Sequence, residues 1–153
     1  MSTSKVRAGE LLALAGAVCV IVSLLVPYYE GPATGVLKAF DTFGPGVALL
    51  LAATAAGLLM FATALTERST ALPVAAAVWA APLGLAGVIA AIVRLLERPQ
   101  HATHVCAGGW LALAGTLAIL LGSWRAVRDE RRPLYPPAEP PPRPRPGAGN
   151  GAA

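Results

Sequence analysis

The sequence predicts an all-α membrane protein, in which four transmembrane helices form an up-down bundle and a disordered proline-rich C-terminal tail follows. Composition is the first observation behind this fold class. Of the 153 residues 56% are hydrophobic and only 13% are charged, which is too apolar for an ordinary soluble domain. The second observation is that four stretches reach the length of about 20 mostly apolar residues that a helix needs to cross a bilayer. They run from about 11 to 28, 45 to 65, 72 to 93 and 105 to 124.

The first stretch, 11–28, follows two basic residues and therefore has the appearance of a signal peptide. It lacks an A-x-A-like cleavage site, and Val18 stands before Cys19 where a lipoprotein site needs a small residue. We therefore interpret it as an uncleaved first helix after a cytoplasmic tail of residues 1–10. Tyr28 and Tyr29 are expected to anchor this helix at the membrane interface.

The second and third stretches are joined to their neighbours by connections rich in turn residues. Residues 30–44 are expected to form an external loop, with Phe40 and Phe43 at the level of the lipid headgroups. Pro82 interrupts the third stretch and is a site for a kink. Arg94 follows that stretch, and its long side chain can extend to the interface.

The fourth stretch carries no charge from Val105 to Trp124 and is followed by six charged residues between 125 and 132. This charge ends the apolar segment and closes a transmembrane domain of residues 11–132. The remaining residues, 133–153, hold eight of the fourteen prolines and no apolar face. We expect this tail to be disordered, with polyproline II character. It is a spacer, a ligand for a protein partner or a segment lying on anionic lipid.

The distribution of Lys and Arg predicts the orientation. With four spans, nine basic residues lie on the side of the two termini and three on the opposite side. The nine are Lys5, Arg7, Arg68, Arg125, Arg128, Arg131, Arg132, Arg143 and Arg145, and the three are Lys38, Arg94 and Arg98. The positive-inside rule then places both termini in the cytoplasm of an inner, or plasma, membrane protein.

Several short motifs occur in a characteristic order: Pro-Tyr-Tyr at 27–29, Ala-Phe-Asp at 39–41, RLLERP at 94–99, and GGWLALAG to GSWRAVRDE over 108–130. In this order the chain resembles small four-span integral membrane proteins of actinomycetes. That family has no assigned activity, so the resemblance implies an architecture and no catalytic residues. Tyr28 departs from the Trp expected in the family's Pro-Trp-Tyr step.

His101, His104 and Cys106 form an H-x-x-H-x-C pattern before the fourth stretch, and all three are metal-ligand types. Histidines at i and i+3 can share a helix face. A fourth ligand would have to come from Glu97 or Asp41, and no established metal motif is present. The favoured interpretation is a loop with two solvated histidines and a small buried thiol, without metal or other cofactor. The alternative is a metal- or redox-responsive site.

The polar residues inside the spans are few and neutral. Ser23, Thr54, Thr63 and Thr116 are expected to bond carbonyls of the preceding turn or of a neighbouring helix. No ionisable residue lies between the span ends, which disfavours coupled transport. No Ser/His/Asp set, paired carboxylates or phosphate-binding loop is visible, so the sequence predicts neither a catalytic site nor an enzyme.

Small residues recur at four-residue spacing on the third and fourth spans, where they let helices approach closely. The two columns are Ala76, Ala80 and Gly84, and Ala114, Ala118 and Gly122. These columns are expected to pack helices together, either within the chain or between copies of it in a homo-oligomer. We expect a non-catalytic accessory or interaction protein, whose partners are the lipid bilayer and a membrane or cytoplasmic protein bound by the tail, with no nucleic acid. The alternatives are a small transporter or channel component and the membrane sensor.

Overall fold

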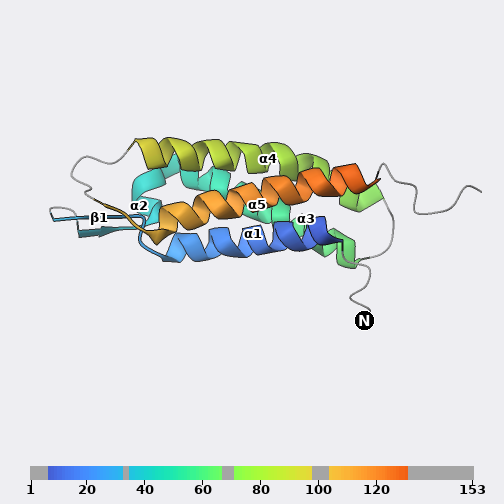
Figure 1. Ribbon diagram of the computed structural model, residues 1–153, viewed down its shortest axis with the longest axis horizontal. Helices are drawn as coiled ribbons and strands as arrows, with labels where there is room; N and C mark the ends of the chain where they lie inside the picture. The colour runs from blue at the N-terminus through green and yellow to red at the C-terminus, as the bar shows by residue number, and fades with distance from the viewer. Residues whose placement is uncertain (1–6, 33–34, 67–70, 98–103, 131–153) are drawn as a thin grey trace, which may run out of the picture.

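The computed structural model describes residues 7–32, 35–66, 71–97 and 104–130 (Figure 1). Almost all of them are helical. The long helices are α1 (Ala8–Leu25), α3 (Val47–Leu65), α4 (Ala71–Leu96) and α5 (Ala107–Glu130). A short helix α2 (Ala39–Phe43) and a 3-10 turn η2 (Gly44–Gly46) lead into α3. Three short strands lie together at one end of the long helices (Figure 1).

Four helical segments are long and apolar enough to cross a membrane. They are Ala8–Leu25, Ala39–Leu65, Ala75–Leu96 and Ala107–Arg128. Each overlaps one predicted stretch, so the number and approximate position of the apolar helices are confirmed. The predicted tail of residues 133–153 and the loop near Arg68 lie outside the described residues.

Helix α1 begins and ends earlier than predicted. It stops at Leu25 because Pro27 disfavours the helical conformation of the residue before it, and Val26 is extended, with φ −91° and ψ 149°. At its other end the helix starts at Ala8, which brings Glu10 into its first turn. Glu10 is only 6% exposed and accepts a hydrogen bond from the Arg7 backbone N–H at 2.9 Å. A buried carboxylate inside the first helix was not predicted.

Helices α4 and α5 both run further than their apolar stretches. α4 continues through Pro82 to Leu96, so Arg94 belongs to its last turn. α5 begins at Ala107 and continues past Trp124 to Glu130. The charged residues therefore end the apolar segment without ending the helix, because Arg and Glu are good helix formers.

In the predicted external loop of residues 30–44, most of the described residues, 30–32 and 35–44, belong to strands, a short helix and a 3-10 turn. Strand β1 (Tyr29–Gly31) pairs antiparallel with β2 (Gly35–Leu37) on one side and with β3 (His104–Val105) on the other. The sheet order is therefore β2-β1-β3. Gly35 takes a positive φ of 63° at the start of β2, a conformation that favours glycine. This sheet ties the α1–α3 connection to the α4–α5 connection.

Glycines bring α1 and α5 into backbone contact. A Cβ atom added to Gly16 would lie 2.5 Å from the Gly115 carbonyl oxygen, and one added to Gly9 would lie 2.7 Å from that of Gly122. The order of these contacts makes the two helices antiparallel. Buried residues alternate at spacings of four and three on both: Gly9, Ala13, Gly16, Val20 and Ser23 on α1, and Gly108, Ala112, Gly115, Ile119, Gly122 and Ala126 on α5. This period is typical of a coiled-coil seam.

The predicted small-residue columns are confirmed in part. Ala76, Ala80 and Gly84 are all buried, and Gly84 lies against the Leu120 backbone of α5. On α5, however, Ala114 is exposed and Ala118 half-buried, because the buried face follows the seven-residue spacing of the glycines. Both Gly84 and Gly122 therefore make contacts within the chain. A homo-oligomer stays a prediction, and it would need another face.

The neutral polar residues behave as predicted. Ser23 donates to the Val20 carbonyl at 2.6 Å, and Thr54 donates to that of Leu50 at 2.7 Å. Thr63 and Thr116 bond Met60 and Ala112 in the same way, at 2.9 and 2.8 Å. Each hydroxyl is thereby satisfied inside its own helix.

Candidate functional site

Several side-chain hydrogen bonds and aromatic contacts between distant segments lie at the end of the molecule that carries the sheet. Tyr28, Tyr29 and Phe43 are each 1% exposed, and we call these three residues the aromatic cap. The tyrosines were expected to be interface anchors, and this prediction is wrong. Sheet pairing turns the chain back after α1, because the Tyr28 N–H donates to the Leu37 carbonyl at 2.9 Å and the Cys106 N–H donates to the Tyr28 carbonyl at 2.8 Å.

Tyr28 lies beyond the end of α1 and is the centre of the aromatic cap. Its hydroxyl is hydrogen-bonded to Ser23 Oγ at 2.9 Å, and its ring meets Phe43 edge-on at a centroid distance of 5.2 Å. Burial raises the pKa of the Tyr28 hydroxyl, since desolvation disfavours the charged phenolate, while the Ser23 hydrogen bond acts in the opposite direction. Tyr28 therefore remains a neutral structural group.

Arg94 is held against the aromatic cap at two points. The Tyr29 hydroxyl donates to the Arg94 carbonyl and so fixes the last turn of α4. The Arg94 guanidinium donates to the Phe43 carbonyl at 3.4 Å and lies 5.8 Å from the centroid of the Phe43 ring. The predicted extension of Arg94 toward the interface is therefore accompanied by a specific cation–π contact.

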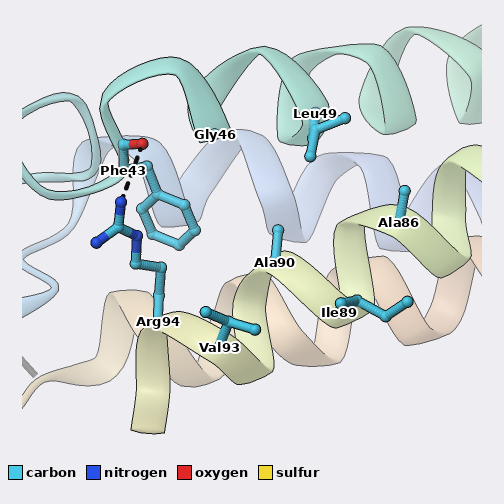
Figure 2. Close-up of a pocket in the computed structure, with 8 residues that line it drawn as sticks. All are labelled: Phe43, Gly46, Leu49, Ala86, Ile89, Ala90, Val93 and Arg94. Atoms are coloured by element: carbon cyan, nitrogen blue, oxygen red, sulfur yellow. Dashed lines mark hydrogen bonds between the residues drawn. The ribbon is translucent and has the colours of Figure 1, made fainter. Parts of the chain in front are cut away.

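An apolar groove opens beside this arginine, between α3 and α4. We call it the α3–α4 groove, and its volume is about 330 Å³. Figure 2 shows Arg94 and Phe43 at one end and the side chains of Ala90, Ile89 and Ala86 following one another along α4. Gly46 and Leu49 line it on the side of α3 (Figure 2). The groove thus combines an apolar channel with a cation at its end.

Phe40 and Phe43, predicted at the same level, have different environments. Phe40 is 60% exposed, whereas Phe43 is buried in the aromatic cap. Asp41 on α2 is exposed and its carboxylate accepts a hydrogen bond from the Lys38 N–H at 3.2 Å. Asp41 thus stabilises the first turn of α2.

The candidate metal ligands are not brought together in the part that the structure describes. His104 is exposed in strand β3, not on a helix, so it cannot share a helix face with a second histidine. Cys106 is half-buried, and its thiol is free. His101 lies outside the described residues. Among those described, no three His, Cys, Asp or Glu side chains are close enough to hold a metal ion.

Sequence reasoning named Tyr28, Tyr29, Phe43 and Arg94 but did not connect them. The contacts depend on β1 pairing with both β2 and β3, and strands of two or three residues leave no periodic pattern to read. One signal was available for the α1–α5 seam: Gly108, Gly115 and Gly122 recur every seven residues. The groove left no comparable signal, since it depends on the relative position of two helices.

The chain was compared with protein families, with curated proteins and with solved structures. No protein-family model matches the chain, and no curated protein or solved structure matches it.

Proposed function

We propose that this chain is a multi-pass inner-membrane protein with four transmembrane helices in an up-down bundle and both termini in the cytoplasm. Its role is that of a non-catalytic accessory or interaction protein. One observation carries the membrane assignment: the large apolar side chains face outward, while the interior is built from small residues.

The interior of the bundle consists largely of Ala, Gly, Ser and Thr. Ala13, Ala17, Ala53, Ala80 and Ala112 are all fully buried. The outer surface carries Leu25, Leu59, Leu85, Ile89, Leu121 and other large apolar residues, exposed by 49% or more. In water such a surface would be unfavourable by about 25 cal/mol per Å². In lipid the same surface contacts acyl chains and carries no such cost. The small interior residues allow the helices to pack closely.

The positions of the tryptophans and of the basic residues also support a lipid bilayer as the environment of the helices. Trp110 and Trp124 are each 60% exposed near opposite ends of α5. Fourteen residues of helix separate them by about 21 Å, and long side chains at these two positions can extend toward the two interfaces of a hydrocarbon core of about 30 Å. Arg7, Arg125 and Arg128 lie at the end where α1 begins and α5 ends, in line with the positive-inside rule (Figure 1).

The non-catalytic role rests on how polar groups are used. Within residues 7–32, 35–66, 71–97 and 104–130, no buried side-chain nitrogen or oxygen lacks a hydrogen-bond partner. The polar groups are thus committed to helix turns and caps, and they form no cluster like that of an active site. The proline-rich sequence of residues 133–146 is typical of ligands that bind as polyproline II, and it supplies the element of the proposal that binds a cytoplasmic partner.

Cysteine labelling tests the membrane topology. In a background with Cys19→Ala and Cys106→Ala, Lys38→Cys on the sheet side is expected to react with an impermeant maleimide in intact cells. Arg125→Cys at the opposite end should react only after the membrane is permeabilised. Labelling of both positions in intact cells, or the reversed pattern, would contradict the orientation, and release of the chain by alkaline extraction would contradict the membrane assignment.

Crosslinked pull-down from native membranes tests the accessory role. We expect a partner to be captured by the full chain and lost on truncation after Arg132. A partner retained by both would move the binding site to the helices. No partner in either, together with ion or solute flux through the purified protein in liposomes, would favour the small transporter or channel component. Buried Glu10 in α1 is the residue that this alternative would use.

A further inference from the structure

We propose that the α3–α4 groove binds one anionic phospholipid, with an acyl chain in the groove and the phosphate on the Arg94 guanidinium. This inference rests on the proposed function, because a lipid reaches the groove only if the helices cross a bilayer.

The shape of the groove follows from small residues in two separate segments. Gly46, at the end of η2 just before α3, and Ala86 and Ala90 on α4 add little bulk to the lining of the groove. The rims are formed by Leu49, Ile89 and Val93, which are exposed by 41 to 55%. Its volume of about 330 Å³ is within the range of roughly 300–1,000 Å³ typical of small-ligand sites. An apolar, outward-open groove of this kind suits a hydrocarbon chain.

The Arg94 guanidinium lies at the level expected for the phosphate of a phospholipid whose acyl chain is in the groove. Arg94 is in the last turn of α4, and the next residue, Leu95, lies against Gly109 of α5: a Cβ on Gly109 would be 3.0 Å from Leu95 Cδ2. Arg94 is therefore level with the first turn of α5, which carries the exposed Trp110. Tryptophan at a helix end marks the headgroup region. From Arg94 to Ala86 the groove follows α4 for about 12 Å into the apolar layer.

Arg94 is positioned and still has donors to offer. Within the described part of the chain, its guanidinium contacts the Phe43 carbonyl and the Phe43 ring, and no carboxylate is among these contacts. A guanidinium has five N–H donors in a planar fork that matches a phosphate. The ring contact fixes the plane of the fork, so less conformational freedom is lost when a phosphate binds.

Native mass spectrometry of the detergent-purified full chain tests the inference. The probes are dioleoyl phosphatidylglycerol and dioleoyl phosphatidylcholine, titrated separately, with sn-glycerol 3-phosphate as the headgroup without acyl chains. Arg94→Gln removes the charge and keeps the groove, and Ala90→Leu fills the groove and keeps the charge. The matched controls are Arg125→Gln at the opposite helix end and Ala114→Leu on the exposed face of α5.

We expect the wild-type chain to retain one phosphatidylglycerol with about fivefold preference over phosphatidylcholine, the effect of one interfacial arginine. Arg94→Gln should abolish this preference by weakening phosphatidylglycerol binding more than phosphatidylcholine binding, because the choline cation of phosphatidylcholine offsets the attraction between its phosphate and the guanidinium. Ala90→Leu should weaken the binding of both lipids, and the two controls should behave as wild type. Glycerol phosphate should not displace the lipid.

Other outcomes overturn the inference in distinguishable ways. Equal affinity for the two lipids in the wild type, or a preference that survives Arg94→Gln, removes the role of Arg94. Displacement by glycerol phosphate makes the site one for a free phosphate group. A dimer that Ala90→Leu dissociates makes the groove an interface between copies of the chain. Each of these leaves the proposed function intact if the chain resists alkaline extraction, whereas extraction of the chain defeats both.

Discussion

Gly16 and Gly115 face each other where α1 and α5 run closest, and neither position has room for a side chain. Alanine normally stabilises a helix by about 0.8–1.0 kcal/mol relative to glycine. At Gly16 this gain is opposed by a Cβ only 2.5 Å from a backbone oxygen, which the two helices can relieve only by moving apart. At Gly16 the steric cost of the added Cβ is larger than the gain in helix propensity.

We therefore predict that Gly16→Ala lowers the free energy of unfolding by about 1–3 kcal/mol, the usual cost of overpacking. The measurement is SDS-induced unfolding in mixed micelles. Gly46→Ala is the matched control, because its Cβ would meet the Phe43 side chain at an ordinary 3.5 Å. Equal stability of Gly16→Ala and wild type would contradict the close α1–α5 contact.

Because of Tyr28, the free energy of unfolding is expected to decrease as the pH rises into the alkaline range. Its pKa is raised by burial, so the folded protein keeps the phenolic proton where the unfolded chain has lost it. This contribution is complete below the usual pKa of about 10 and is lost as the pH rises through the raised value.

Tyr28→Phe should lower stability near pH 8 by about 0.5–1.5 kcal/mol, the usual worth of one hydrogen bond. The difference between the variant and wild type should then shrink toward pH 11, because phenylalanine does not ionise. Unfolding midpoints of both proteins between pH 8 and 11 measure this, and parallel profiles would contradict the buried position of Tyr28.

The small sheet acts at the scale of elements by joining two connections that lie far apart in the chain. Strand β1 is its middle strand, and the Cys106 and Gly108 N–H groups donate to the Tyr28 and Pro27 carbonyls. These hydrogen bonds align the start of α5 with the end of α1. Tyr29 of β1 and Phe43 of α2 both contact Arg94 of α4, at the end of the groove.

Cys106→Pro should therefore destabilise the protein by about 1–3 kcal/mol, because it removes the N–H that satisfies the Tyr28 carbonyl. Cys106→Ala keeps this N–H and should unfold at nearly the same SDS concentration as wild type. A large loss of stability in Cys106→Ala, or a change in its response to oxidant or metal, would instead support a sensing role for the thiol.

At the scale of the whole molecule, the arrangement of side chains is reversed relative to a soluble bundle. Many large apolar residues lie on the outside, and alanine is the commonest residue in the hydrophobic core. This arrangement predicts where the tryptophans lie in a bilayer. Trp110 and Trp124, separated by about 21 Å along α5, should lie near the two headgroup regions.

Two single-tryptophan variants test this placement. One retains Trp110 and the other retains Trp124, and in each the other two tryptophans are replaced by Phe. In liposomes, their fluorescence should be quenched more by phospholipids brominated near the headgroup than by those brominated deep in the acyl chain. A variant that retains only Trp79, which is 71% exposed and lies within α4, serves as the comparison. Absence of quenching in all three would place the helices outside the bilayer.

The four apolar helices, their order and their approximate bounds could be predicted from the order of residues along the chain. Each depends on about 20 consecutive residues, so hydropathy alone reveals it. The same order of residues also predicts the hydrogen bonds of Ser23, Thr54, Thr63 and Thr116, because these close within one helical turn.

Which helix faces pack together, and which residues meet at the end that carries the sheet, depend on contacts between distant segments. The sequence identified Tyr28 and Tyr29 only as interface anchors and Arg94 only as a side chain that extends to the interface. It did not reveal their contacts, because most of the partners come from distant segments. The sheet buries both tyrosines and places Phe43 against Arg94. The groove is lined by small residues from two separate segments, Gly46 of η2 and Ala86 and Ala90 of α4. Such contacts depend on packing between elements, and no local pattern of residues encodes their geometry.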